Sequence, residues 1–360
     1  MKITIFIGGL SGGGAERVAC NLANSLVSRG HAVEMLTMSD AKEAYGLDER
    51  VTRAALLQES ERKNVIYNTA LRMRRLRRYL REHKDVDAYV VMLPVTILMM
   101  MLVRGATRAK IILSERNDPV NYSPRMQKLL KHYCGKADGL VFQTDVVKEW
   151  YAPCLKKARG TVIPNAINPA FLRPAYEGER EKVIVGAGRL NTQKNFPLLI
   201  RAFAKVADRF PEHKLVIYGQ GALEESLKTL AGELGVGDRV VFPGYVDNMP
   251  ERLEKASMFV LSSDYEGMPN ALMEAMASGL PCVSCDCGGG GARFLIRDGE
   301  NGLLVPCKDE EALAGAMQKV LSDEALAAML GSKARQLQET LAPEHIYGVW
   351  ESFIKELAEK

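Results

Sequence analysis

The feature that most constrains this chain is a regular alternation of short apolar runs with longer amphipathic segments. The runs of the first half are Ile3–Gly8, Ala32–Met38, Ala88–Leu93, Ile111–Ser114, Leu140–Thr144 and Thr161–Pro164. The second half repeats the pattern with Val183–Gly186, Leu215–Tyr218, Val240–Phe242, Phe259–Ser262, Cys282–Cys285 and Leu303–Val305. Runs rich in Val and Ile that alternate with helical segments are typical of parallel strands buried on both faces. Because the pattern occurs twice, the sequence predicts an α/β fold of two doubly wound domains.

The length of the chain and one irregular segment predict where these domains meet. A chain of 360 residues exceeds the usual size of a single domain. The pattern breaks between Asn168 and Glu181, where two prolines, Gly178 and mixed charges are typical of a linker. We therefore expect one domain at 1–168, a second at 169–345 and a final amphipathic helix at 346–360.

Charge is distributed unevenly between the two halves. Residues 1–170 hold 27 Lys and Arg against 16 Asp and Glu, whereas residues 171–360 hold 21 against 28. A basic half suggests an anionic surface or ligand, although a chance distribution of solvated charge explains the same counts. Within the basic half, helical spacing in 72–81 sets an apolar stripe opposite four arginines, Arg74, Arg77, Arg78 and Arg81. We expect this helix to dock on acidic lipid head groups; the alternative is an ordinary solvated helix face.

Cysteine usage and hydropathy indicate the compartment. Seven cysteines without a credible secretory signal favour reduced thiols and a cytoplasmic protein, peripheral at most on the inner face of the plasma membrane. The longest apolar run, Met92–Val103, contains Pro94 and is shorter than the ~18 residues of a spanning helix, so it predicts a strand end plus a buried helix. Cys282, Cys285 and Cys287 are expected to be small buried hydrophobes, because a zinc site lacks a nearby fourth ligand. We expect no metal, no cofactor and no nucleic-acid partner.

A glycine-rich loop leaves the first predicted strand and opens a helix. Gly13 and Gly14 end this loop of residues 8–14, and their amides are placed to approach an anion at the positive end of a helix dipole. A plain tight turn is the simpler interpretation. A dinucleotide site is the other alternative, but the glycines do not fit G-x-G-x-x-G and no acid ends the second strand. An oxidoreductase is therefore disfavoured.

The second half opens with a comparable loop that carries two cations. Gly188 follows a strand, and Arg189 and Lys194 precede the next helix. Two cations at the carboxyl end of a parallel strand are placed to neutralise a pyrophosphate. The alternative is a solvated loop.

Two acids lie near the end of a later strand in the same half. Glu266 lies in the loop after Phe259–Ser262, and Glu274 lies in the following helix among small apolar residues. Burying an acid without a partner is costly, so folding alone explains Glu274 poorly. The start of this helix offers a second anion cradle, formed by Gly267, Met268, Pro269 and Asn270. Glycines after two further strands, at 219–221 and 288–291, suggest that backbone lines a cleft at this sheet edge.

With these motifs, the chain resembles the large family of retaining glycosyltransferases often numbered family 4, over nearly its full length. The most specific motif is a Glu pair with seven intervening residues, met by Glu266 and Glu274. Gly-Gly-Ala-Glu at 13–16, Pro-Asn-Ala-Ile at 164–167 and Asp-Gly-Glu-Asn-Gly-Leu-Leu-Val-Pro at 298–306 add to it. The resemblance implies the GT-B fold, in which two Rossmann-like domains face each other across an interdomain cleft. The N-terminal domain would bind the acceptor, the C-terminal domain the nucleotide sugar, and the last helix would pack back on the N-terminal domain.

The resemblance also implies roles for individual residues. Arg189 and Lys194 would hold the diphosphate, Glu274 the ribose hydroxyls, and Glu266 would lie by the transferred sugar. Members of the family often carry a His after the fourth N-terminal strand, where this chain has Arg116. They also often carry Gly-Pro-x-Glu, where this chain has Gly-Gly-Ala-Arg, which leaves the donor sugar undefined.

We therefore expect transfer of a hexose or N-acetylhexosamine from a UDP-sugar to a hydroxyl acceptor, with retention and without a metal. The acceptor expected is a glycan or a polyprenyl-diphosphate-linked precursor of polysaccharide biosynthesis. The enzyme alternative is a nucleotide-sugar epimerase or hydrolase of the same fold, and a non-enzymatic sugar-nucleotide binding protein is a weaker one.

Overall fold

The computed structural model describes residues 1–40, 45–155 and 158–359, and the chain divides into two compact units. One unit comprises Met1–Ala166 with Glu344–Lys360, and the other comprises Ile167–Pro343. The chain therefore passes between the units twice, each time two residues before the boundary expected from the sequence. Residues 168–181, expected to be a linker, belong to the C-terminal unit, where Phe171 is buried.

The N-terminal unit is built on a parallel sheet. Within the described residues it has seven strands in the order β3-β2-β1-β4-β5-β6-β7. Their bounds are β1 Lys2–Ile7, β2 Ala32–Thr37, β3 Thr52–Ala55, β4 Ala88–Met92, β5 Lys110–Ser114, β6 Gly139–Phe142 and β7 Arg159–Val162. The apolar runs predicted six of these strands. They did not predict β3, because this edge strand reads Thr-Arg-Ala-Ala and is largely exposed.

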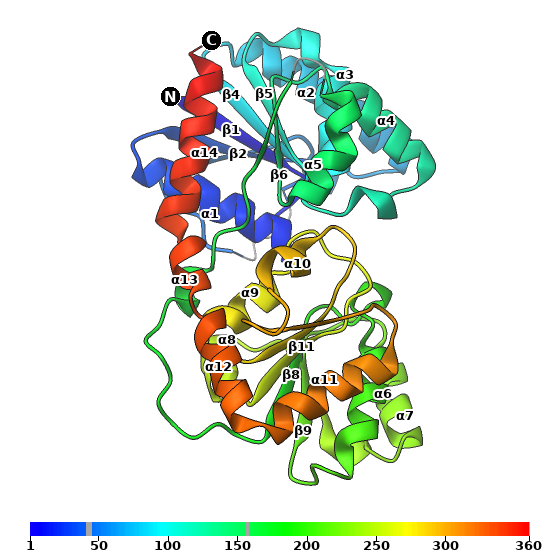
Figure 1. The fold of residues 1–360 in the computed structure, drawn as a ribbon. Coiled ribbons are helices and arrows are strands. Elements are labelled where there is room, and N and C mark those ends of the chain that lie inside the picture. Colours follow the sequence, from blue (N-terminus) through cyan, green and yellow to red (C-terminus); the bar gives the residue numbers. More distant parts are fainter. Residues whose placement is uncertain (41–44, 156–157, 360) are drawn as a thin grey trace. The chain divides into compact units, whose positions relative to one another are not determined.

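Two groups of helices cover this sheet (Figure 1). The first group packs its apolar side chains into one buried cluster with Phe6, Tyr89 and Leu113 of the sheet. It consists of α2 Val65–Glu82, α3 Pro94–Leu102, α4 Pro124–Cys134 and α5 Asp145–Tyr151. The second group is α1 Gly14–Ser28 and α14 Pro343–Ala358. The apolar run of Met92–Val103 is a strand end followed by the buried helix α3, as its sequence predicts.

Helix α14 completes the N-terminal unit although it comes last in the chain. It buries Trp350, Phe353 and Leu357. Gly139 of β6 has no side chain, and the position of a Cβ there lies 2.6 Å from Leu357 and 3.0 Å from Phe353. Arg29, just after α1, bonds to Glu344 and Glu351 of α14. Helix α14 therefore packs on β6 and beside α1.

The C-terminal unit repeats the plan. Within the described residues its parallel sheet has six strands in the order β10-β9-β8-β11-β12-β13. Their bounds are β8 Val183–Ala187, β9 Lys214–Tyr218, β10 Val240–Gly244, β11 Met258–Leu261, β12 Cys282–Cys285 and β13 Leu303–Val305. The helices are α6 Phe196–Ala207, α7 Glu224–Glu233, α8 Met249–Lys255, α9 Asn270–Ala277, α10 Gly291–Leu295, α11 Glu310–Ser322, α12 Glu324–Ala334 and α13 Leu337–Thr340.

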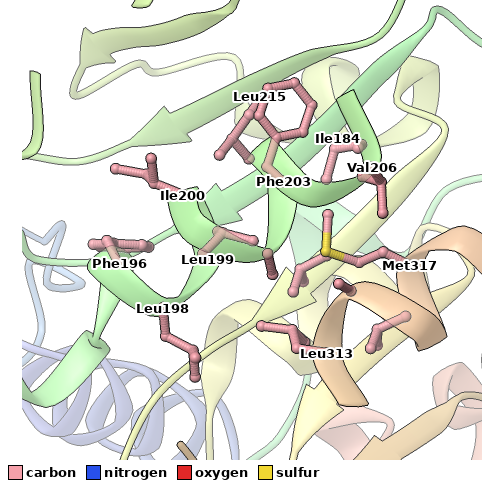
Figure 2. Close-up of a cluster of buried hydrophobic side chains, with 14 of the residues drawn as sticks. Ile184, Phe196, Leu198, Leu199, Ile200, Phe203, Val206, Leu215, Leu313 and Met317 are labelled. Carbon is pink, nitrogen blue, oxygen red and sulfur yellow. The ribbon is translucent and has the colours of Figure 1, made fainter. Parts of the chain in front are cut away.

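The core of this unit lies between the sheet and the helices α6 and α11 (Figure 2). Leu199 and Phe203 of α6 meet Ile184 of β8, and Leu313 and Met317 of α11 close the cluster. Fully burying side chains of this size stabilises a fold by about 1.5–3 kcal/mol each. The packing fixes α6 against β8, and with it the loop that joins them.

Both sheets reverse their strand order at an internal position, between β1 and β4 and between β8 and β11. In doubly wound sheets, ligands bind beyond the carboxyl ends of the strands at such a switch point. In the described part of the chain, no helix combines the length and apolar character that crossing a membrane requires.

Candidate functional site

An ion pair lies at the switch point of the C-terminal sheet. Lys194 follows β8 and Glu266 follows β11, and Lys194 Nζ lies 2.5 Å from Glu266 Oε1. The two side chains are 17% and 10% exposed, respectively. The Ser263 hydroxyl donates to the same carboxylate oxygen at 2.8 Å. The structure thus brings together one predicted cation and one predicted acid, and it holds the acid with a hydroxyl.

Backbone and side-chain hydrogen bonds tie the two loops together. The Asp264 amide donates to the Gln193 carbonyl at 2.9 Å, and Gln193 Nε2 donates to the Tyr265 carbonyl at 2.9 Å. Asn195 has a left-handed backbone with φ of 44°, and its Nδ2 donates to Asp264 Oδ1 at 2.8 Å. The loops therefore present Lys194 and Glu266 from a bonded framework.

Glycines are required where the two loops pass close to other groups. Gly188 has a φ of +152°, and a Cβ there would lie 2.7 Å from Lys194 Cε. A Cβ at Gly291, the first residue of α10, would lie 2.0 Å from the Gly267 carbonyl oxygen. A side chain at either position would displace the cation or the loop that carries Glu266.

The other residues of this unit that were predicted to form the site are close to Lys194 or to Glu266 in the sequence. Arg189 is exposed, and among the described residues its side chain makes no ion pair. Glu274 lies on α9 with its side chain buried. Met268 and Pro269 are buried, and Asn270 begins α9. Of the predicted cations and acids of this unit, Lys194 and Glu266 are in contact in this structure.

The glycine loop of the N-terminal unit already holds a carboxylate. The amides of Gly12 and Gly13 donate to Glu16 Oε2 at 2.6 and 2.8 Å, and Gly14 is the first residue of α1. This arrangement is a capping contact in which the side chain of Glu16 satisfies amides at the helix start. An anionic ligand of the Gly12 and Gly13 amides would have to displace Glu16.

Arg116 follows β5 and is buried, with its side chain between Asn165 and α14. Its Nη1 donates to Asn165 Oδ1 at 2.9 Å, and the same oxygen accepts a bond of 2.9 Å from Gln143 Nε2. The guanidinium carbon lies 5.3 Å from the centre of the Trp350 ring. Among the described residues, Nε and Nη2 of Arg116 are buried without a hydrogen-bond partner. Burial lowers the pKa of Arg116 to about 10.

The neighbouring Glu115 lies at the centre of a second polar cluster. The hydroxyls of Tyr151 and Tyr122 donate to its carboxylate at 2.7 and 2.8 Å, and the amides of Arg116 and Asn117 donate to it as well. Burial raises the pKa of Glu115, and these hydrogen bonds oppose the rise.

Sequence reasoning assigned no role to several residues that shape these sites. Ser263 lies in the same segment as Glu266, and Gln193 lies in the same segment as Lys194. This proximity in sequence is the signal that could have identified them. Glu16 belongs to the Gly-Gly-Ala-Glu motif, and its three-residue spacing from Gly13 is the spacing at which a Glu side chain accepts from the N-cap amide, which is one half of a capping box. Within the described residues, no group of His, Cys, Asp or Glu could hold a metal ion.

Comparison with known proteins then places the chain in a family. The family model described as Glycosyltransferase Family 4 matches residues 12–171, and that described as Glycosyl transferases group 1 matches residues 171–337. Together the two matches include the end of the glycine loop from residue 12, Arg116 and both acids. The chain is a group 1 glycosyltransferase. Its two Rossmann-like units are the two domains of the GT-B fold, as the sequence predicts.

Relatives and solved structures agree with this assignment over the full length. This glycosyltransferase is 28% identical to the GalNAc-alpha-(1->4)-GalNAc-alpha-(1->3)-diNAcBac-PP-undecaprenol alpha-1,4-N-acetyl-D-galactosaminyltransferase of Campylobacter jejuni, covering 99% of each chain. In fold it is similar to sucrose-phosphate synthase from Thermosynechococcus elongatus, with a TM-score of 0.86 at 20% identity over 99% of this chain and 98% of that one. It is also similar to the pneumococcal O-GlcNAc transferase GtfA, solved with UDP and GlcNAc, with a TM-score of 0.83 at 14% identity over 100% and 99%.

Proposed function

We propose that this glycosyltransferase moves a hexose or N-acetylhexosamine from a UDP-sugar to a hydroxyl of a lipid-linked or polysaccharide precursor glycan, with retention. The observation that carries the proposal is the Lys194–Glu266 pair at the switch point of the C-terminal sheet, with Glu274 on the helix that follows. In this proposal the cation binds the diphosphate, the acid in the loop contacts the sugar, and the acid on the helix binds the ribose hydroxyls.

The pairing of Lys194 with Glu266 suggests how the donor binds. A diphosphate brings more negative charge than one carboxylate, so it competes for the Lys194 ammonium. Arg189, exposed in the same loop, adds a second cation, and charge-assisted hydrogen bonds of this kind contribute roughly 1.5–3 kcal/mol each. Once the ammonium turns to the diphosphate, Glu266 keeps the Ser263 hydroxyl and is free to accept a hydrogen bond from the sugar.

The proposed reaction breaks the bond between the anomeric carbon and the diphosphate oxygen while the acceptor oxygen bonds to the same carbon. Negative charge grows on the leaving diphosphate, where Lys194 and Arg189 stabilise it. The proton of the acceptor hydroxyl passes to the leaving phosphate, so no protein general base is assigned. We propose that no metal ion takes part and that Lys194 and Arg189 supply the positive charge.

The N-terminal unit is proposed to bind the acceptor. The Campylobacter relative is named for transfer to an undecaprenol-diphosphate-linked glycan, which supports a lipid-linked acceptor here. We also propose that the positive charge of the buried Arg116 serves the reaction; its Nε and Nη2 have no hydrogen-bond partner among the described residues.

Because a lipid-linked acceptor lies in a membrane, we also propose that the enzyme binds peripherally to an anionic membrane surface. Helix α2 buries Leu76 and Leu80 and exposes its arginine face, while Val65 and Ile66 at its start are 81% and 82% exposed. Exposed apolar side chains beside a basic face are typical of a helix that lies on a membrane surface.

A thermal-shift panel with UDP, GDP and ADP tests the donor, because a ligand of the native state raises the melting temperature by mass action. We expect UDP to give the largest shift. Incubation with UDP-sugars alone tests the epimerase or hydrolase alternative: rapid turnover without acceptor would replace the transferase proposal. We expect turnover only when a lipid-linked glycan is added.

A further inference from the structure

The exposed apolar side chains of the N-terminal unit gather on one of its two groups of helices. Apart from Val349 of α14, every exposed large apolar residue described in this unit belongs to α2, α3, α5 or the turn before α4. They are Val65, Ile66 and Tyr67 of α2, Val95 and Leu102 of α3, Val120 of the turn Pro119–Asn121, and Val146 of α5. These helices pack on the sheet in one cluster, so they present one common face to solvent.

Helix α3 carries an apolar row along its outer side. Val95 and Leu102 are 51% and 58% exposed, and Leu98 between them is partly exposed. Residues three and four apart lie on the same side of a helix, so the three side chains form one row. Residues 88–103 contain no charged residue. Helix α3 therefore offers apolar surface where a solvated helix usually carries charges.

Two basic helices lie on either side of this row. Helix α2 leads into β4, α3 joins β4 to β5, and α4 joins β5 to β6; these strands are neighbours in the sheet, so α3 lies between α2 and α4 (Figure 1). The exposed cations are Arg74, Arg77, Arg78 and Arg81 on α2, and Arg125, Lys128 and Lys131 on α4.

The two basic rows contain almost no opposing charge. Residues 119–137, which include α4, contain no Asp or Glu, and the one acid within α2 is Glu82, which pairs with Arg78. Apolar patches with a charged rim mark interaction surfaces, and cationic rows favour an anionic partner. A second copy of this chain fits poorly, because the same face would set cations against cations.

We propose that the outer sides of α2, α3 and α4 form the face by which the enzyme lies on an anionic membrane, and that α3 is the helix that enters it. The cations reach the lipid phosphates, while the row of Val95, Leu98 and Leu102 enters the boundary between head groups and acyl chains. This inference rests on the membrane position proposed above and assigns its face and its entering helix.

The orientation connects the membrane with the proposed acceptor site. Val95 is the second residue of α3 and follows the end of β4, while Arg116 follows the neighbouring strand β5. Both residues thus lie at the carboxyl edge of the sheet. From this edge the row runs along α3 for about 10 Å, seven residues at 1.5 Å each. A lipid-linked acceptor in the membrane would meet the enzyme at the edge that carries Arg116.

The first test separates apolar entry from charge attraction. The full chain is sedimented with vesicles of equal parts phosphatidylglycerol and phosphatidylcholine, at low and at high salt. Val95→Ser with Leu102→Ser should lower vesicle partitioning about tenfold and remove the part of binding that resists salt, because salt screens charges but not apolar burial. The matched control is Val241→Ser with Met329→Ser, at two apolar residues 41% and 36% exposed in the C-terminal unit, and it should bind like the unsubstituted chain.

The second test concerns the basic row on α4. Changing Arg125, Lys128 and Lys131 to Gln should lower partitioning roughly 100-fold and weaken its salt dependence. Its control changes Arg209, Lys214 and Lys319, exposed in the C-terminal unit, to Gln and should change neither. Melting temperatures confirm that each variant is folded.

The outcomes that overturn the proposal are distinct. Equal partitioning of the two Ser pairs overturns entry by α3, and equal partitioning of the two Gln triples overturns the role of α4. If the Ser pair on α3 dissociates a dimer in size-exclusion chromatography and leaves vesicle binding unaltered, the face joins two copies of the chain instead. No donor or acceptor is used, so failure of UDP to bind counts against the proposed donor and leaves the sedimentation to decide this proposal.

Discussion

At the scale of single residues, the C-terminal site is a balance of charges rather than an open cationic cradle. Lys194 is held by Glu266, and Glu266 is held in turn by Ser263. Two opposite charges so little exposed stabilise each other, whereas removal of one leaves the other charge buried and costly. The ion pair of Lys194 with Glu266 is therefore the contact that we propose a diphosphate rearranges.

The first prediction concerns the two cations. Lys194→Ala and Arg189→Ala should each lower kcat/KM roughly 10- to 100-fold, because each would remove the charge-assisted contact that we propose strengthens as the diphosphate leaves. Lys194→Ala should cost more, since it also leaves Glu266 unpaired beside the phosphates. Initial rates at low donor concentration measure both. Near-normal kcat/KM in either variant removes that residue from the diphosphate site.

The second prediction separates the two acids. Glu274→Ala should weaken UDP binding, because its carboxylate is proposed to hold the ribose hydroxyls. Glu266→Ala should mainly lower kcat, because its carboxylate is proposed to meet the sugar. Binding of UDP by calorimetry and steady-state kinetics give the two quantities. The ribose assignment is lost if Glu274→Ala binds UDP as tightly as the unsubstituted chain.

At the scale of elements, the sequence predicted strands by their burial and not by their pairing. Strands such as β8 and β11 are apolar throughout, so their runs were visible; β3 pairs with β2 but is exposed, and its sequence resembles a loop. The site followed the same rule. Lys194 and Glu266 were predicted because each lies close to the end of a strand. The hydrogen bond from the Ser263 hydroxyl to Glu266 could not be predicted, because no local sequence pattern indicates it.

The third prediction concerns α2 and an anionic membrane. Changing Arg74, Arg77, Arg78 and Arg81 to Gln should abolish co-sedimentation with anionic vesicles, since each arginine near such a surface contributes about 1 kcal/mol. Arg78 also pairs with Glu82 at 2.8 Å, so its share should be smaller. Binding of the unsubstituted chain should weaken as salt screens the charges.

The control for this experiment removes equal charge elsewhere. Arg209, Lys214, Arg297 and Lys319 are exposed in the C-terminal unit, and changing these four to Gln should leave vesicle binding intact. Equal binding to neutral and anionic vesicles, or equal loss in both quadruple variants, would show that α2 is an ordinary solvated helix.

The fourth prediction concerns the attachment of α14 at low pH. Contacts with Lys355 and His31 lower the pKa of Glu351 to about 2 from its ordinary 4.5. Because the folded pKa is the lower one, the stability that Glu351 contributes is complete above pH 4.5 and is lost as pH falls toward 2. Melting temperatures across this range should fall less steeply in Glu351→Gln. Glu344→Gln, whose 91% exposed side chain also contacts Arg29, should follow the unsubstituted chain.

At the scale of the whole molecule, one topology is used twice, and the last helix of the chain belongs to the first unit. Each sheet extends outward from a switch point, so each unit places its loops at one edge. The N-terminal unit nevertheless includes the last helix of the chain, because α14 covers β6 where Gly139 leaves room for Phe353 and Leu357.

The fifth prediction follows from this place of α14 in the N-terminal unit. A chain ending at Pro343 should lose the folded N-terminal unit, because it exposes the surface that Trp350, Phe353 and Leu357 cover and removes the ring beside the Arg116 guanidinium. Truncating one buried aromatic side chain alone costs about 3–5 kcal/mol, a large part of the 5–15 kcal/mol that stabilises a domain. Limited proteolysis should then degrade residues 1–166 and spare 167–343, while a chain that ends at Ala358 resists like the complete one. Equal protection of both units in the chain that ends at Pro343 would show that the N-terminal sheet and its own helices suffice, and that α14 only adds to a unit already folded.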